Sequence, residues 1–460
     1  MAEIIFLVPL IALFFAFRHN AAWLFLYVYL PSLLLFPDTF HTQMTGLPKL
    51  SINQAMILGI IPFAIQQYRR FWKWTITDLM VIALMMCMSY SEYAGSNIND
   101  ARNLTVTMWS AALFPYVLCK LCLLAEDIEI ALTRVFVGLM AVVTFICIYE
   151  ARFGFNPFIA LLQPFFPGQG MGWVTTFRYG FARIAGPFAH AILAGIMMAM
   201  TYRLHRWLQW GGHWDGHLHL LKRLPWDPAK VLTVLFFLGM VMTVARGPWL
   251  GGVAGAMIVF LSRTKNRRRA LWILLALVLV CVPALYVGFQ SYLDIQPGMK
   301  MTMSQESAMY RKVLMEKYID IAIEHAVFGW GRNTWPKVPG MESIDNYYLL
   351  LTLMHGLSTM LLLVVLMLSL SVRLVIRGMK ELPGAASLAM THAGIIVMVA
   401  VSLVTVYLGE QVIPAVFLIF GWADACLIRP YRPQDYLPAT EAQPEHQVDD
   451  SAFPGKRIIQ

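Results

Sequence analysis

Long uninterrupted apolar stretches are the feature of this sequence that most limits how the chain can fold. Hydrophobic residues make up 59% of the 460 residues and charged residues 13%, about half the charged share of a soluble globular chain. A run of about 18 apolar residues is long enough to cross the hydrocarbon core of a bilayer. Because backbone polar groups in lipid must pair within their own segment, such runs form helices. The sequence therefore predicts an all-α integral membrane protein.

The apolar runs predict a bundle of about 12–13 transmembrane helices within residues 1–436. The first run, 4–17, lacks the basic flank and cleavage site of a signal peptide, so we expect a retained helix. Residues 437–460 are polar and rich in Pro, Glu, Gln and Asp, which predicts a disordered tail. The thirteen predicted spans lie near residues 4–17, 21–36, 53–67, 76–91, 104–122, 129–149, 186–203, 231–245, 247–262, 270–289, 346–372, 384–408 and 412–428.

The short loops between these spans predict the orientation of the chain. Basic residues cluster in one alternating set of loops, around residues 69–73, 203–223, 263–269, 373–380 and 429–432. The positive-inside rule places this set, and with it the tail, in the cytoplasm. The opposite face then carries two long segments, 150–185 and 290–345, and long loops of a compact membrane protein usually carry function. We therefore expect the active face to be the outer one.

Three arginines lie on the predicted outer face, against the positive-inside bias. Arg183 precedes a span, Arg246 lies in a tight turn between two spans, and Arg311 lies inside the long segment 290–345. Arginine stays charged, and its planar guanidinium matches phosphate oxygens, so converging arginines indicate a diphosphate or a similar anion. Each arginine taken alone is also compatible with a contact to lipid headgroups or with a helix C-cap.

The segment 290–345 has its own predicted structure. Residues 304–325 read as an amphipathic helix lying across the mouth of the bundle, with Ser304 as N-cap and Tyr310 on its apolar side. The helix ends before Phe328-Gly-Trp-Gly331, whose glycines permit a sharp turn. Asp345 opens the next span, where it is expected either to cap the helix or to accept a proton from a hydroxyl nucleophile.

Taken in order, these motifs resemble the O-antigen ligase and polymerase superfamily. The resemblance lies in Arg183-Ile-Ala-Gly-Pro-Phe188, in Thr243-Val-Ala-Arg-Gly247, in a long outer segment with Arg311 and a Gly-x-Gly turn, and in Asp345-Asn-Tyr-Tyr-Leu349 followed by Gly356. It covers about residues 180–360 by motif and the whole chain by topology. It implies a GT-C type fold, with 290–345 as a large helical periplasmic loop, in the bacterial inner membrane.

The resemblance also implies a metal-independent glycosyltransferase without cofactor. Such an enzyme moves a glycan from undecaprenyl diphosphate to a hydroxyl acceptor at the periplasmic face, with inversion. Arg183, Arg246 and Arg311 would hold the donor diphosphate, and we expect His190, Tyr310 and Asn346 to bind substrate as well. Asp345 is the first candidate for the catalytic base, and Glu410 is the second.

The acceptor separates the remaining functional alternatives. Ligases of the superfamily place His where this chain has Asp345, which favours a polymerase of exopolysaccharide, capsule or O-antigen repeat units. A ligase with a non-polymer acceptor and a lipid-linked oligosaccharide flippase stay open as alternatives, although the sequence shows no convincing internal repeat of the kind that transporters carry. Expected partners are the lipid-linked glycan, membrane lipid and a chain-length regulator or export machinery. The net charge of +9 falls in short loops and does not indicate nucleic-acid binding.

Overall fold

The computed structural model describes residues 2–43, 48–171, 175–214, 225–293, 302–341, 343–409 and 411–430, which are mostly helical. The first half contains η1 (Ala2–Leu7), α1 (Val8–Ala16), α2 (Ala21–Leu24), η2 (Phe25–Tyr29), α3 (Leu30–Leu35), α4 (Ile52–Tyr68), η3 (Arg69–Phe71), α5 (Ile76–Gly95), α6 (Ile98–Met108), η4 (Trp109–Leu113), α7 (Phe114–Ala125), α8 (Glu129–Phe153), α9 (Pro157–Leu162) and η5 (Gln163–Phe165). The second half contains β1 (Phe177–Arg178), β2 (Phe181–Ala182), α10 (Ala191–Trp210), α11 (Pro228–Met242), α12 (Arg246–Arg263), α13 (Arg267–Leu293), α14 (Met303–Glu324), α15 (Tyr347–Lys380), α16 (Leu388–Ser402) and α17 (Val412–Ile428).

The predicted all-α membrane fold is confirmed, and each of the predicted spans coincides with a helix or a run of consecutive helices. Four helices in the described residues are long and apolar enough to cross a membrane: Ile98–Ala125, Glu129–Phe153, Arg267–Leu293 and Tyr347–Lys380. Further apolar helices are shorter, such as Pro228–Met242 and Val412–Ile428. The prediction for span 186–203 began too early, because residues 186–190 form a turn before α10.

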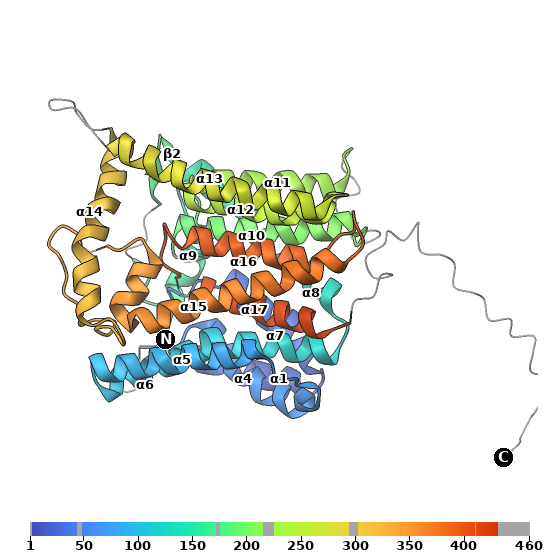
Figure 1. Ribbon diagram of the computed structural model, residues 1–460. Helices are drawn as coiled ribbons and strands as arrows, with labels where there is room; N and C mark the ends of the chain where they lie inside the picture. Colours follow the sequence, from blue (N-terminus) through green and yellow to red (C-terminus); the bar gives the residue numbers. More distant parts are fainter. Residues whose placement is uncertain are drawn as a thin grey trace, which may run out of the picture.

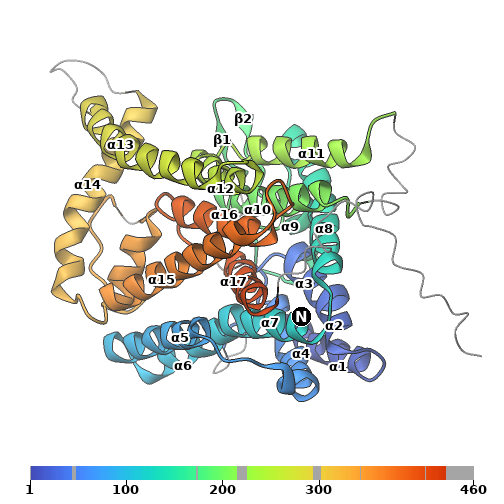
Figure 2. The same cartoon turned by 45° about the vertical axis from the view of Figure 1, so that its right-hand side comes forward.

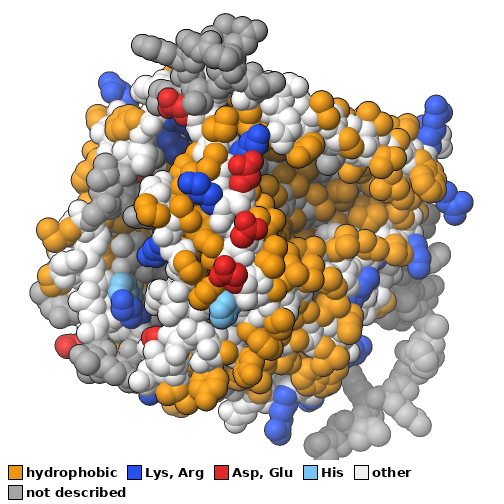
Figure 3. All heavy atoms as spheres, turned by 60° about the vertical axis from the view of Figure 1, so that its left-hand side comes forward, with side chains coloured by type: hydrophobic (Ala, Val, Ile, Leu, Met, Phe, Trp, Pro, Cys, Tyr) orange, Lys and Arg blue, Asp and Glu red, His pale blue; other side chains and the backbone are white. Residues whose placement is uncertain are grey.

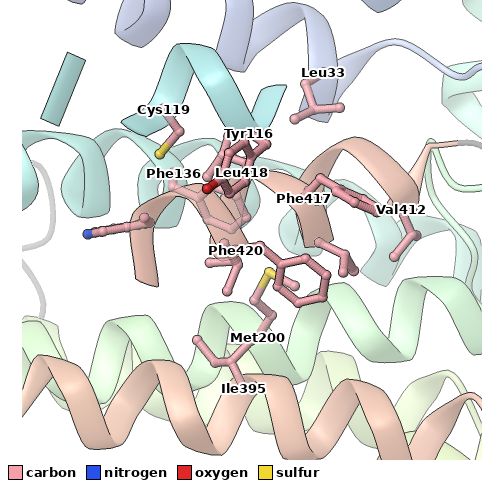
Figure 4. Close-up of a cluster of buried hydrophobic side chains, with 14 of the residues drawn as sticks. Leu33, Tyr116, Cys119, Phe136, Met200, Ile395, Val412, Phe417, Leu418 and Phe420 are labelled. Atoms are coloured by element: carbon pink, nitrogen blue, oxygen red, sulfur yellow. The ribbon is translucent and has the colours of Figure 1, made fainter. Parts of the chain in front are cut away.

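Helix α17 lies at the centre of the bundle, where its residues Val412–Cys426 are buried. Figure 4 shows Phe417 and Phe420 of α17 among Leu33, Phe136 and Ile395, which come from other helices. A helix that is apolar on all sides belongs in the interior of a bundle. The other helices therefore pack around α17, which contacts α7, α15 and α16.

Helices α12 and α16 approach each other closely through glycines. A methyl group added at Gly251 would lie 2.5 Å from the carbonyl oxygen of Met398, and one at Gly255 would overlap the carbonyl of Gly394. Small residues let two helix backbones meet at this distance in a membrane. The face of α12 that carries Gly251 and Gly255 therefore packs against α16.

The two ends of the bundle differ, as Figures 1 and 2 show. The basic end gathers the short turns: Arg263 donates to the carbonyl oxygen of Gly384 (2.7 Å), and Arg429 lies 2.7 Å from Asp127. The opposite end, which we name the α14 end, is crossed by α14. The basic loops of the predicted cytoplasmic set thus come together at one end, and the predicted outer segments lie at the other.

A buried cluster of charges ties four helices together near the basic end. Lys120 of α7 lies 2.6 Å from Asp78 of α5 and 2.7 Å from Asp424 of α17, and all three side chains are buried. Arg373 of α15 adds a second contact to Asp424 at 3.3 Å. Tyr116 donates a hydrogen bond to Asp78 at 2.6 Å. Each buried carboxylate has several partners in the protein, and these partners offset the cost of removing its charge from water.

Helix α14 begins and ends within one residue of the helix predicted at 304–325. Its apolar side buries Leu314 and Tyr318 against Trp335 and Leu349. The predicted N-cap was wrong, however. Thr302 caps the helix and forms a capping box with Gln305, so the helix begins one residue before Ser304. The predicted disordered tail, 437–460, lies outside the described residues.

Candidate functional site at the α14 end

Three arginines converge on the turn between α11 and α12. Arg183 Nε donates to the carbonyl oxygen of Thr243 at 3.1 Å, and Arg178 Nη1 donates to that of Val244 at 3.4 Å. Arg246 is the first residue of α12, and its Nη2 donates to the hydroxyl of Tyr179. Sequence reasoning placed Arg246 in the turn and missed Arg178 altogether. The segment 150–185 and the α11–α12 turn therefore join to form one cationic group.

A short hairpin delivers two of these contacts. Strands β1 and β2 pair antiparallel, with Arg178 opposite Phe181, and Tyr179 and Gly180 form the two-residue turn between them. Both turn residues have positive φ, at 53° and 79°, as a type I′ hairpin requires. The hairpin thereby holds the Tyr179 hydroxyl over Arg246, whose guanidinium also lies 5.9 Å from the Tyr179 ring. Tyr179 and Arg178 were not predicted, because a hairpin this short leaves little trace in the apolar pattern.

The cationic group is incompletely satisfied by the protein. Arg183 Nη2 is buried and has no hydrogen-bond partner among the described residues. Burial lowers the pKa of Arg183, and the nearby charge of Arg178 lowers it further. Arginine nevertheless stays protonated. Arg246 lies at a helix N-terminus, where the helix dipole disfavours a cation and favours an anion. An anionic ligand between these groups would relieve both costs.

The position of Arg183 is set by a buried carboxylate from helix α8, more than 30 residues earlier in the chain. Glu150, at the end of α8, accepts a hydrogen bond from the backbone N–H of Gly186 at 2.8 Å, and Asn156 donates to the carbonyl oxygen of Gly186 at 2.7 Å. Gly186 has φ of +59°, and a side chain there would collide with Cys147 Sγ at 2.8 Å. The Gly of the Arg-x-x-Gly-Pro motif is therefore required by the turn that aims Arg183.

His190 joins the cationic group to the start of α15. Its Nδ1 accepts a hydrogen bond from the backbone N–H of Ile192 at 3.2 Å, which makes His190 the N-cap of α10. Burial lowers the pKa of His190 below its ordinary value, and the charge of Arg183 adds to this effect. The carboxylate of Asp345 acts in the opposite direction. The charges of Arg183 and Asp345, two of the predicted site residues, therefore act on His190 in opposite directions.

Asp345 faces α14 and does not cap α15. Its carboxylate lies 3.6 Å from the guanidinium of Arg311, and both side chains are about two-fifths exposed. The N-cap of α15 is Asn346, whose side chain accepts hydrogen bonds from the backbone N–H groups of Tyr348 and Leu349. The capping interpretation of Asp345 was wrong, because the neighbouring residue fills that role. Asp345 is left available for chemistry, and Asn346 has a structural function.

Tyr310 fixes α14 against the segment that leads into α15. Tyr310 directly precedes Arg311 in α14, and its hydroxyl donates to the carbonyl oxygen of Ser343 at 2.9 Å. Tyr318 repeats the contact two turns further along, where its hydroxyl donates to the carbonyl oxygen of Met341 at 2.9 Å. These contacts hold Arg311 and Asp345 opposite each other. Glu410, the second candidate base, lies outside the described residues.

The Gly-x-Gly turn after α14 inserts into a break in α15. Gly356 departs from helical geometry, with φ of 80° and ψ of 167°, and the freed groups are bound by the turn. Trp330 N–H donates to the carbonyl oxygen of Leu353 at 2.8 Å, and Leu357 N–H donates to that of Ala326 at 2.6 Å. The part of α15 before the break at Gly356 and the α14 segment therefore form one unit.

Sequence reasoning missed the residues that join this unit to α5. Glu92, fully buried at the end of α5, accepts hydrogen bonds from the backbone N–H of Arg332 (2.9 Å) and from its Nε (3.2 Å). Beside them Ser91 contacts Nδ1 of His355 at 3.2 Å. The available signals were a carboxylate inside an apolar run and an arginine directly after the Gly-x-Gly turn. Figure 3 shows charged side chains gathered at this end of the molecule, next to an apolar flank.

Comparison with known protein families supports the resemblance that the sequence motifs indicated. A family model described as O-antigen ligase matches residues 231–364. This match supports membership of the O-antigen ligase and polymerase superfamily. The matched segment of the chain runs from α11 to the break in α15, and it contains Arg246, Arg311 and Asp345. No curated protein matches the chain.

The match indicates a function of the O-antigen ligase or polymerase type. Members of the superfamily are membrane glycosyltransferase-like enzymes that act on lipid-linked oligosaccharides. Arg183 and His190 precede the matched segment, yet they lie at the same end of the bundle. The predicted resemblance is thus confirmed.

Proposed function

We propose that this protein is a polymerase of a surface polysaccharide. It transfers a glycan from undecaprenyl diphosphate to a sugar hydroxyl at the periplasmic face of the bacterial inner membrane. The observation that supports this most directly is the convergence of Arg178, Arg183 and Arg246 on one turn, with the buried Nη2 of Arg183 unpartnered among the described residues. A diphosphate supplies the oxygens that such a group lacks.

The proposed reaction is an inverting displacement at the anomeric carbon of the donor glycan. Asp345 accepts the proton of the acceptor hydroxyl as that oxygen attacks. The new glycosidic bond forms while the bond between the anomeric carbon and the diphosphate oxygen breaks. The diphosphate leaves with the bonding electron pair, and the arginines stabilise the negative charge that develops on it.

Arg311 serves the reaction by orienting the base. It lies 3.6 Å from Asp345 and is braced by the helix that Tyr310 anchors. The ion pair holds the carboxylate of Asp345 in place, and this carboxylate accepts the proton of the acceptor hydroxyl. His190, held close to neutral by its buried position, offers its second ring nitrogen to the substrate.

The acceptor distinguishes polymerase from ligase. The presence of Asp345 where ligases of the superfamily place His favours a polymerase. The test is to incubate the purified protein in liposomes with a lipid-diphosphate-linked repeat unit, in the presence of a metal chelator, and to separate the products by size. A ladder of lengthened lipid-linked glycan supports the polymerase.

Two other outcomes would reject the polymerase. Transfer of a single unit, only when a non-polymer acceptor is added, identifies a ligase. Unchanged substrate that nevertheless crosses the bilayer only in liposomes containing the protein identifies a flippase. The Arg246→Ala variant is the control in each assay, because all three activities need the donor to bind.

A further inference from the structure

An apolar groove lies on the flank of the bundle, between α10, α11, α12 and α13. It has a volume of about 600 Å³ and is lined on one side by Phe237 and Met240 of α11 and on the other by Ile273 and Leu277 of α13. Figures 1 and 2 show α11, α12 and α13 side by side along this flank. The groove belongs to neither the cationic group nor the Arg311–Asp345 pair.

The floor of the groove is made of small residues that packing does not explain. Gly251 and Gly255 face α16, where an added methyl group would collide with backbone. Gly252 lies on the groove side of α12, and a methyl group there would meet its nearest atom, Met240 Sδ, at 3.7 Å, an ordinary contact. Ala256 follows one turn later on the same side. The small size of these two residues keeps the groove open.

One end of the groove reaches the cationic group. Trp249 lines the groove and lies one turn of α12 away from Arg246. Its Nε1 donates to the carbonyl oxygen of Met240 at 2.9 Å, which braces α11 against α12. From Trp249 the groove follows α12 to Leu261, a distance of roughly 18 Å at the helical rise per residue.

We propose that this groove holds the hydrocarbon chain of the lipid-diphosphate donor. The inference rests on the proposed function, which places the donor diphosphate at Arg183 and Arg246. A chain attached to that diphosphate enters the bilayer beside Trp249, at the outer end of the groove. The lining is almost wholly apolar, and Arg203, which also lines it, has its Nη2 bound to the carbonyl oxygen of Gly252 at 3.1 Å.

The groove should orient the donor more than it raises the affinity of the protein for the donor. Lipid tails are as apolar as the groove lining, so moving a chain from the bilayer into the groove gains packing contacts only. A hydrocarbon chain held along α12 does, however, point the diphosphate at the arginines. The donor then loses less orientational entropy when it reaches the reactive position. Filling the groove should therefore weaken use of a long-chain donor and leave a short-chain donor unaffected.

The test compares two donors that carry the same glycan, one on undecaprenyl diphosphate and one on a single isoprene unit. In the Gly252→Leu/Ala256→Leu variant of the full-length protein, KM for the long-chain donor should rise about five-fold or more. KM for the short-chain donor should stay unchanged. The matched control is Val117→Phe, which fills a separate apolar groove of about 300 Å³ lined by Ile82, Leu113 and Val117. An equal rise with both donors, or the same rise in the control, would overturn the proposal.

A second measurement separates failure of the groove from failure of the proposed function. Undecaprenyl diphosphate with a diazirine on its first isoprene units is photoactivated on the wild-type protein, which needs no turnover. Crosslinks to α12 and α13 that disappear in the double variant support the proposal even if no glycan is transferred. Crosslinks confined to other helices overturn it. So does groove labelling by a diazirine phospholipid that undecaprenyl diphosphate fails to displace, because the groove is then an ordinary lipid site.

Discussion

The carboxylate of Asp345 lies 3.6 Å from the guanidinium of Arg311, across the gap between the start of α15 and the middle of α14. The two residues are 34 positions apart in the chain and meet because Tyr310 and Tyr318 hold α14 against the segment before α15. Asn346 takes the cap of α15, so the carboxylate has no role in ending the helix. The pair is therefore the best candidate for the acid–base chemistry.

Replacing Asp345 by Asn should lower kcat by about 10²–10⁴-fold, because the amide cannot accept the hydroxyl proton. The melting temperature should stay within the error of the wild-type value, since the side chain is partly exposed and caps nothing. Turnover of the lipid-linked repeat unit and scanning fluorimetry in detergent measure the two quantities. Near wild-type turnover would remove Asp345 from the reaction and turn attention to Glu410.

Asn346→Ala should lower the melting temperature more than the activity, the opposite of what is expected for Asp345→Asn. Loss of an N-cap costs about 1 kcal/mol, so the melting temperature should fall. The fall in kcat should be much smaller than that of Asp345→Asn. Asn346→Asp, which keeps a capping oxygen, should restore the melting temperature. A loss of activity as large as that of Asp345→Asn, without a change in stability, would show that Asn346 contacts substrate directly.

Arg246→Ala should reduce kcat by about 10²–10³-fold, the usual effect of removing one donor to a developing charge. Arg246→Lys should recover little of the loss, because an ammonium group cannot form the planar bidentate contact. The comparison of the two variants in the polymer assay decides between geometry and charge. Full activity of the lysine variant would mean that charge alone suffices. Arg311→Ala should also abolish polymer without lowering protein levels.

The stability of the protein should fall below neutral pH partly because of His190. Its pKa is lowered in the folded chain, so as the pH falls through about 6.5 the unfolded chain takes up the proton first. Protonation would also remove the hydrogen bond that Nδ1 accepts from Ile192. In His190→Asn, which keeps a capping oxygen, the melting temperature should depend less on pH between about 5 and 7. An unchanged pH dependence would show that other groups control it.

Lys120→Met should destabilise the fold by about 3–5 kcal/mol, because it leaves Asp78 and Asp424 buried without their shared cation. The correctly folded fraction should retain wild-type KM, since the cluster lies toward the basic end, away from the arginines. Protein yield and melting temperature report the first effect, and kinetics on the folded fraction report the second. Unchanged stability would mean that water or Arg373 compensates the two carboxylates.

The apolar runs alone determined the fold class and nearly every helix of this protein. Segments such as 412–428 are apolar on all sides, and a chain in lipid must satisfy its backbone within each segment, which leaves the helix as the available structure. The order of the arginine motifs also singled out Arg183, Arg246, Arg311 and Asp345 as candidate site residues. Local sequence carries these signals because hydropathy and motif spacing are properties of neighbouring residues.

Only the tertiary structure decided which of those residues meet and what each contacts. Arg178 joins Arg183 and Arg246 through a hairpin of a few residues, and Glu150 aims Arg183 from a helix more than 30 positions away. Whether Asp345 or Asn346 caps α15 depends on side-chain directions that spacing does not specify. The floor of the groove follows from which face of α12 packs on α16. These contacts join segments far apart in sequence, so their geometry is set by how the helices pack.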